Sequence, residues 1–414
     1  MLKQGVMTET SVQALGSVRS NLGRLGLALS LLLGCEKSQP PMPKSPVIPS
    51  GQTLRVATYS EYFGLRTLPT FESKTGNRVE SEVFQSNESL LAHLGSRSFD
   101  VVFLSGYAVE HMLASGRLQK MPRERVPNLA QVPLDFRNPP YDPGLEHCVP
   151  YIWWVIGFAF LPPKSGHTSE PSSLDALFAK DGPEVAWLDD MRATLGMALR
   201  RLGRSPNTRD ATDLAAAREL LLAALPRVVD IVDDPAELLQ SGRISVSMGW
   251  SNDTFSLARK DPRVRFLLPK EGTLLYVDFA CVLQTAKQPE VGFAFLDHLL
   301  EPTISAEIAN TRMIPTVSEG GRKMLDAEAH WMWGTLESLR GHSGRYEPLR
   351  DVGDATLLYE KTCQSGLCQR KSATCGAASS DGRKAASAQA DQRQKVGQPV
   401  LAAASACCFF FHRS

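Results

Sequence analysis

The hydrophobic pattern of the first globular part of the chain switches several times between the period of a strand and that of a helix. Three short apolar or alternating runs predict strands, at Leu54–Ser60, Arg78–Phe84 and Asp100–Leu104. Residues 65–75, 86–96 and Val109–Leu113 have helical spacing, and Ser86 and Asn87 are candidate caps for the second of these helices. This alternation predicts a parallel sheet with helices on both faces.

A second set of strands and helices follows a long apolar run. Residues 148–162, "CVPYIWWVIGFAFLP", are too few to span a bilayer as a helix and rich in β formers, so they predict a core strand. Further strands are predicted at Val185–Leu188, Ile244–Gly249 and Tyr276–Leu283. Helices are predicted at Arg192–Leu202, Ala211–Ala224, Ser251–Arg259 and, as a pair, 289–310.

Both ends of the chain differ from this globular pattern. Residues 25–33 are an apolar run after two arginines, and "Leu32-Leu33-Gly34-Cys35" resembles a bacterial lipobox, which predicts a signal peptide and a lipidated Cys35. A signal peptide without lipidation, or a short hydrophobic anchor, is the alternative. Residues 37–53 are rich in proline and predict an extended tether. Residues 366–414 have no period and predict a disordered or read-through tail.

The bulk charge and the cysteines exclude some functions. The 45 Lys and Arg residues balance the 44 Asp and Glu residues, so nothing in the composition suggests a nucleic-acid partner. A disulfide between Cys148 and Cys281 is left open. The later cysteines form no paired C-x-x-C units, so no zinc site and no metal cofactor are expected.

Aromatic and acidic residues recur where five predicted strands begin or end. Ligands of open α/β sheets lie at the carboxyl ends of strands, so these residues are the candidate site. They are Tyr59, Ser60, Glu61, Tyr62, Ser105, Tyr107, Asp190, Trp250, Asp253, Tyr276 and Asp278, with Asp189 beside them. Each alone has an ordinary structural explanation, and their recurrence at five strands is what favours a site.

The chemistry of this set suits a flexible organic polycation. Aromatic rings contact methylene groups and attract cations, and carboxylates bind ammonium groups through charge-assisted hydrogen bonds. No HExxH, G-x-S-x-G or glycine-rich phosphate motif is present, and no nucleophile–base pair is visible, so we expect no enzyme. The acids Asp230, Asp233 and Asp234 fit a solvated loop better than a site.

In these segments the chain resembles the polyamine-binding proteins of ABC importers, the spermidine and putrescine receptors. The resemblance covers residues 54–361, in order and with similar spacing. Its carriers are "TYSEYF", "SNESL", "FDVVFLSGYAVEHM", "PYIW", "DDMRATLGMALRRLG", "MGWSND", "PKEG…YVD", "IPT" and "DVGDATLLYEK". Ala193, Ile314 and Leu349 depart from the spermidine-type pattern, which leaves the preferred amine open.

The resemblance implies a type II periplasmic-binding-protein-like α/β fold of two lobes, with the ligand between them. It implies ring contacts from Tyr59, Tyr62, Tyr107, Trp250 and Tyr276, amine contacts from Glu61, Asp190 and Asp278, and polar contacts from Ser60 and Ser105. The expected division is a signal peptide (1–35), a tether (36–53), a first lobe (54–157 with 277–315), a second lobe (158–276 with 316–365) and a tail (366–414).

The expected function is capture of spermidine or putrescine by a monomeric, lipid-anchored receptor in the cell envelope, which delivers the amine to an ABC permease. A sensory lipoprotein of the same fold, or a receptor for another organic cation, is the alternative. An iron receptor is disfavoured because the chain has no adjacent tyrosine pair.

Overall fold

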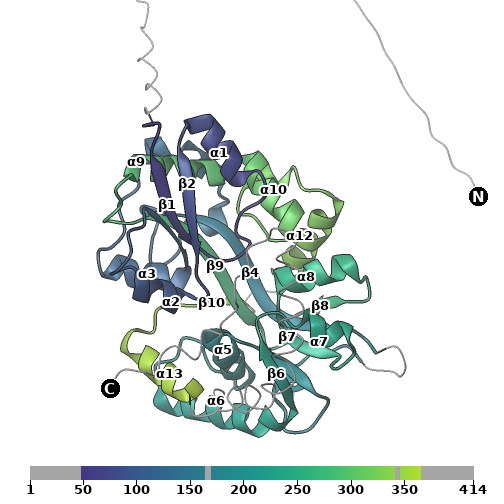
Figure 1. Ribbon diagram of the computed structural model, residues 1–414. Coiled ribbons are helices and arrows are strands. Elements are labelled where there is room, and N and C mark those ends of the chain that lie inside the picture. Colours follow the sequence, from purple (N-terminus) through teal and green to yellow (C-terminus); the bar gives the residue numbers. More distant parts are fainter. Residues whose placement is uncertain (1–47, 164–168, 341–345, 365–414) are drawn as a thin grey trace, which may run out of the picture. The chain divides into compact units, whose positions relative to one another are not determined.

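Two long strands, β4 (Cys148–Phe160) and β9 (Thr273–Val282), form the centre of the fold (Figure 1). The computed structural model describes residues 48–163, 169–340 and 346–364. β4 and β9 pair antiparallel from Cys148–Cys281 to Val155–Leu275, and all but one residue of β4 is buried. The apolar run is therefore a core strand, as predicted, because neighbours cover both of its faces.

The first lobe extends from β9 through three parallel strands. These are β1 (Thr53–Thr58), β2 (Arg78–Val83) and β3 (Val101–Ser105). β1 lies between β2 and β3, and β3 pairs antiparallel with β9, which gives the order β2-β1-β3-β9-β4. The intervening helices are α1 (Thr67–Thr75), α2 (Asn87–His93) and α3 (Gly106–Ala114). The predicted alternation of strands and helices is confirmed.

The second lobe extends from the other half of β4 in the order β4-β7-β5-β6. Its strands are β5 (Val185–Leu188), β6 (Val228–Val232), β7 (Val246–Trp250) and the short β8 (Arg265–Leu267). Its helices are α4 (Asp175–Phe178), α5 (Met191–Arg201), α6 (Ala211–Ala224), α7 (Ala236–Gln240) and α8 (Ser251–Lys260). β6 was not predicted, because "VVDIV" is short and carries an aspartate at its centre.

The chain then returns to the first lobe and finally to the second. The helices are α9 (Pro289–Leu299), α10 (Pro302–Arg312), α11 (Glu319–Arg322) and α12 (Ala327–Arg340), followed by β10 (Tyr346–Pro348) and α13 (Thr356–Gln364). We expected residues after 315 to belong to the second lobe. Instead Trp333 and Leu336 pack in the core of the first lobe. The next residue that packs in the core of the second lobe is Leu349.

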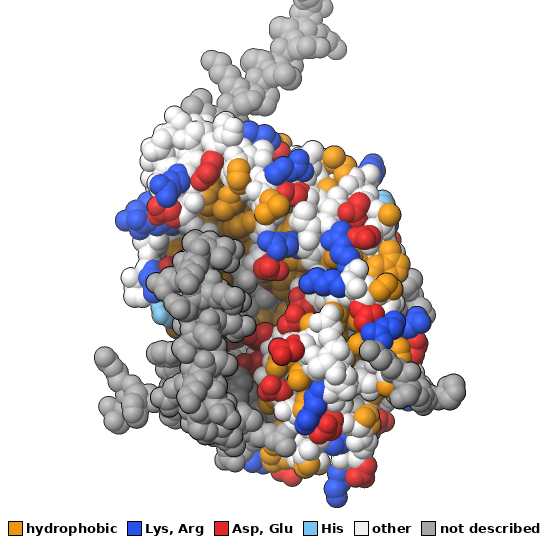
Figure 2. Space-filling model, turned by 45° about the vertical axis from the view of Figure 1, so that its right-hand side comes forward, with side chains coloured by type: hydrophobic (Ala, Val, Ile, Leu, Met, Phe, Trp, Pro, Cys, Tyr) orange, Lys and Arg blue, Asp and Glu red, His pale blue; other side chains and the backbone are white. Residues whose placement is uncertain are grey.

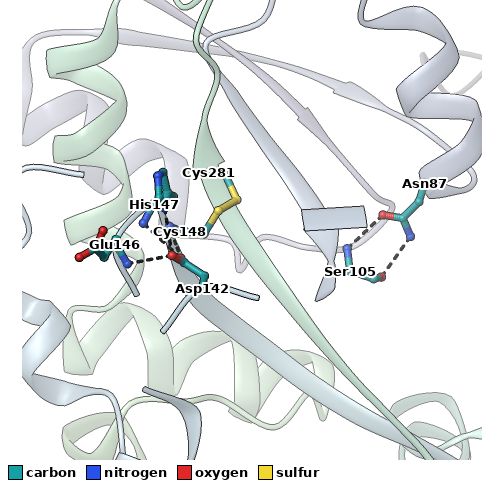
Figure 3. Close-up of a disulfide and its surroundings, with 7 residues drawn as sticks. All are labelled: Asn87, Ser105, Asp142, Glu146, His147, Cys148 and Cys281. Carbon is teal, nitrogen blue, oxygen red and sulfur yellow. Dashed lines mark hydrogen bonds and ion pairs between the residues drawn. A yellow bond between two sulfur atoms is a disulfide. The ribbon is translucent and has the colours of Figure 1, made fainter. Parts of the chain in front are cut away.

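A disulfide joins Cys148 and Cys281, which lie directly opposite each other on β4 and β9 (Figure 3). The start of β4 is also held by Asp142, whose buried carboxylate accepts hydrogen bonds from the backbone N–H groups of Glu146, His147 and Cys148. These contacts fix the first-lobe half of the central strand pair. Within the described ranges, no helix combines the length and the apolar character needed to cross a membrane.

Candidate ligand-binding site

Aromatic rings from both lobes form one connected cluster where the strands of the two lobes meet. Tyr59 and Tyr62, after β1, have ring centroids 5.1 Å apart, and Tyr62 lies 5.9 Å from Trp154 of β4. Trp154 is 6.3 Å from Trp250 at the end of β7, and Trp250 is 5.0 Å from Tyr276 of β9. The structure therefore brings together four of the five predicted ring contacts and adds Trp154.

Asp278 lies at the centre of the first-lobe side of this cluster. It faces Ser105 across the β3–β9 pair, and its Oδ2 accepts a hydrogen bond from the hydroxyl of Tyr62. Only 1% of Asp278 is exposed, and its Oδ1 has no partner in the described structure. Burial raises the pKa of Asp278 to about 6, although hydrogen bonds from Tyr62 and Ser105 act in the opposite direction.

A hydrogen-bond network at the start of α2 positions the fifth ring. Asn87 accepts from the backbone N–H of Ser105 at 3.0 Å and donates to the Ser105 hydroxyl at 3.1 Å (Figure 3). Asn87 also donates to the hydroxyl of Tyr107 at 3.0 Å, and that hydroxyl donates to Glu88 Oε1 at 3.0 Å. Neither Asn87 nor Glu88 was predicted as a site residue. Both follow the end of β2, so the strand-end criterion extended to β2 finds them.

Asp190 is the acid of the second lobe at this end of the cluster. It caps α5, and its Oδ1 accepts a hydrogen bond from the backbone N–H of Ala193 at 2.7 Å. Burial, with a smaller contribution from the negative charge of Glu88, raises the pKa of Asp190 to about 6. The charge of Arg192 acts in the opposite direction. Glu88, Asp190 and Asp278 are called the inner acids below.

A second group of acids lies near Asp253, in the first turn of α8. Burial, with smaller contributions from the charges of Asp234, Glu61 and Asp233, raises the pKa of Asp253 to about 7. Asp233 and Asp234 are exposed, as expected of a solvated loop, and yet their charges reach the predicted site. These four residues are called the outer acids. Figure 2 shows acidic side chains gathered near the middle of one face of the molecule.

Two predicted contacts lie at the margin of the cluster. Glu61 is exposed and forms an ion pair with Arg312 at 3.0 Å. Its backbone φ is +60°, in the left-handed region, which follows from the tight turn after β1. Ser60 is exposed as well. Direct ligand contacts by Ser60 and Glu61 remain predictions.

Four buried polar atoms of the cluster have no hydrogen-bond partner in the described structure. They are the hydroxyls of Tyr59 and Tyr276, the indole N–H of Trp154 and Oδ1 of Asp278. Buried polar atoms are nearly always paired, so four orphans in one place indicate a site that completes its hydrogen bonds with a bound solute. Among the described residues, no group of three or more His, Cys, Asp or Glu side chains is placed to hold a metal ion.

The charge of the inner end also points to a cationic solute. Among the three inner acids, the charge of Arg192 acts on Asp190, and it also acts on the nearby Tyr276. When the inner acids are ionised, they place negative charge in a poorly solvated space. Uncompensated buried charge is unfavourable, so a cation bound there stabilises the arrangement. The surrounding rings suit the apolar part of such a molecule.

Comparison with known proteins agrees with this geometry. The family model described as bacterial extracellular solute-binding protein matches residues 54–310. The putrescine-binding periplasmic protein SpuD of Pseudomonas aeruginosa is 30% identical over 289 residues, 64% of this chain and 78% of SpuD. The spermidine/putrescine-binding periplasmic protein of Escherichia coli is 28% identical over 323 residues, 75% of this chain and 90% of the relative.

Solved structures show the same fold. The TpPotD lipoprotein of Treponema pallidum aligns with a TM-score of 0.66 and 25% identity, over 76% of this chain and 98% of that one. The substrate-binding protein PotD of Streptococcus pneumoniae aligns with a TM-score of 0.61 and 21% identity, over 75% and 99% of the two chains. The two-lobed α/β fold expected from the sequence is confirmed. The chain belongs to the family of bacterial extracellular solute-binding proteins.

Proposed function

We propose that this protein captures a polyamine, spermidine or putrescine, between its two lobes and delivers it to an ABC importer. One observation carries the proposal: four orphaned buried polar atoms lie in an aromatic cluster bordered by the inner acids. The names of the relatives from Pseudomonas aeruginosa and Escherichia coli support the same class of ligand.

A polyamine matches both features of the cluster. Its ammonium groups supply donors for the inner acids, and its methylene chain packs on the rings of Trp154, Trp250 and Tyr276. The rings and acids come from both lobes, so a ligand that reaches both sets stabilises the closed arrangement. In this proposal Tyr59, Tyr62 and Tyr107 contact the ligand from the first lobe, and Asp190 and Trp250 from the second.

We also propose that the protein works as a monomer in the cell envelope, held by a lipid on Cys35. Relatives are named periplasmic, and the Cys148–Cys281 disulfide is typical of extracytoplasmic proteins. Cys35 lies outside the described residues. Fatty-acid labelling of the cells tests the anchor, and labelling that persists in Cys35→Ser would contradict it. Light scattering of the purified chain tests the monomer, and a dimer mass would contradict it.

Calorimetric titration of the full chain tests the ligand class. Putrescine, spermidine and spermine are compared with butylamine, which has one ammonium group. We expect at least one polyamine to bind at least a hundredfold more tightly than butylamine, because only a polyamine satisfies several acids. Tight binding also stabilises the fold, by about 4 kcal/mol at a thousandfold excess over Kd. Absence of binding by all three polyamines would overturn the proposal, and recovery of the bound amine unchanged checks that no enzymatic turnover occurs.

A further inference from the structure

Glu88 is an acid of the inner end whose position is fixed by the fold. It lies in the first turn of α2, where the hydroxyl of Ser86 accepts a hydrogen bond from the backbone N–H of Ser89 at 3.1 Å. The adjacent Asn87 ties this turn to β3 through two hydrogen bonds with Ser105. The carboxylate of Glu88 is therefore held at the sheet edge from which the first-lobe site residues project.

The carboxylate of Glu88 shares its surroundings with the ligand-facing phenols. Its Oε1 accepts a hydrogen bond from Tyr107 at 3.0 Å. Burial raises the pKa values of Tyr59 and Tyr276, and the charge of Glu88 adds to the increase at both hydroxyls. These are two of the four orphaned polar atoms. Glu88 is thus close enough to act on the space that the solute would fill.

No described cationic side chain forms an ion pair with Glu88. The guanidinium of Arg192 lies 5.4 Å from the centre of the Tyr107 ring. Its Nη2 donates instead to Asn207 Oδ1 at 3.2 Å and to the carbonyls of Pro206 and Arg350 at 3.5 and 3.3 Å. The negative charge of Glu88 acts on Asp190, an acid of the other lobe, and no ion pair with a described cationic side chain neutralises Glu88.

We propose that Glu88 is a ligand-binding carboxylate which, together with Asp190, holds one ammonium group of the bound amine across the junction of the two lobes. This inference rests on the proposed polyamine function. In the ligand-free protein the two like charges oppose closure, because Glu88 belongs to the first lobe and Asp190 to the second. An ammonium group between them replaces repulsion by two charge-assisted hydrogen bonds, so binding and closure are coupled at this pair.

The test compares Glu88→Gln and Glu88→Asp with the wild-type chain and with Glu319→Gln, an exposed acid of α11 that serves as matched control. The readout is the affinity for the tightest of putrescine, spermidine and spermine, at low and at high salt. We expect Glu88→Gln to weaken binding at least tenfold at both salt concentrations, because a charge in this poorly solvated setting is screened little by salt. The amine affinity of Glu88→Asp should fall about threefold, because the variant keeps the charge but its side chain is one methylene shorter. Glu319→Gln should bind as the wild type does.

Closure supplies a readout that a purely structural role of Glu88 would not change. By small-angle scattering, ligand-free Glu88→Gln should be more compact than ligand-free wild type, because the repulsion with Asp190 is gone. Wild-type binding that persists unchanged in both Glu88 variants would overturn this inference and leave the polyamine function standing. A wild-type chain that binds none of the three amines would overturn both. If Glu88→Gln does not fold, Glu88→Asp decides, and unchanged affinity in that variant would count against the inference.

Discussion

The two acidic ends of the site differ in how the protein holds them. At the inner end, Asp278 and Glu88 each accept a hydrogen bond from a tyrosine hydroxyl. At the outer end, Asp253 accepts from its neighbour Asn252 at 2.7 Å, and Asp234 is exposed to solvent. The inner end is therefore organised before a ligand arrives, whereas three of the four outer acids, Glu61, Asp233 and Asp234, are exposed to solvent.

Because of this difference, we expect the two ends to contribute differently to the affinity and to the rate of ligand binding. A charge in a poorly solvated, prearranged setting interacts strongly with a bound ammonium group and is screened little by salt. Exposed acids raise the local concentration of a cation and speed its arrival, but each contributes little to the final affinity. We therefore expect the inner acids to determine how long the amine stays bound and the outer acids to determine how fast it arrives.

The largest effect is expected from Asp278→Asn. Asparagine keeps the shape and can still accept from Tyr62, so the main loss is one buried charge. Removing one partner of a buried, hydrogen-bonded charge pair costs about 2 to 5 kcal/mol, so polyamine affinity should fall about thirtyfold or more. Calorimetry measures the loss, with Asp354→Asn, an exposed acid near α13, as control. Retention of affinity within threefold would show that Asp278 does not hold an ammonium group.

The pH dependence should separate binding from stability. The pKa values of Asp190 and Asp278 are raised to about 6 in the ligand-free fold, and in the proposed complex both groups bind the amine in their ionised form. Lowering the pH from about 7.5 to 5 should therefore weaken binding, on the order of tenfold for each carboxylate. The sign for stability is opposite. A carboxyl whose pKa is higher in the folded than in the unfolded state stabilises the fold at low pH, and this contribution is lost as pH rises through about 6.

Two series of measurements check that binding and stability change in opposite directions with pH. Calorimetry at several pH values gives the affinity, and urea unfolding of the ligand-free protein gives the stability. In Asp278→Asn both pH dependences should become shallower, because one of the two titrating groups is gone. If the affinity does not change between pH 7.5 and 5, then binding of the amine is not coupled to ionisation of Asp190 or Asp278.

The sequence predicted the residues that directly follow strands better than those within or beside them. Tyr59, Asp190 and Trp250 were found because a short apolar run that ends in aromatic or acidic residues is readable without the structure. Trp154 was missed because it lies inside a uniformly apolar strand, where no alternation shows which face it occupies. Glu88 was missed because its neighbours Ser86 and Asn87 also fit the ordinary start of a helix.

The hydrophobic pattern of the sequence could not predict which distant residues contact each other. The family resemblance implied an amine contact for Glu61, and only the structure shows its ion pair with Arg312, 251 residues later in the chain. The pattern of residues 327–340 predicts no particular partner, and only the tertiary structure shows Trp333 packing 5.8 Å from Trp153 in the first lobe. The fold class could be predicted because local periodicity determines it, whereas the lobe boundary depends on which core a helix joins.

The smallest effect is expected at the outer acids, where Asp253→Asn and Asp234→Asn are compared. Burial contributes to the raised pKa of Asp253, about 7, so this group is partly protonated near neutral pH and its removal costs only part of a charge. We expect Asp253→Asn to weaken binding about threefold to tenfold at pH 8, and less at pH 6.5, where the aspartate is already largely neutral. Asp234 is exposed to solvent, so Asp234→Asn should change the association rate of the amine by less than threefold, and about 0.5 M salt should remove this effect. Stopped-flow kinetics measures the association rate and the dissociation rate of the amine separately. A hundredfold loss in Asp253→Asn, carried by the dissociation rate, would instead give the outer end the same role as Asp278, and the distinction between the two ends would fail.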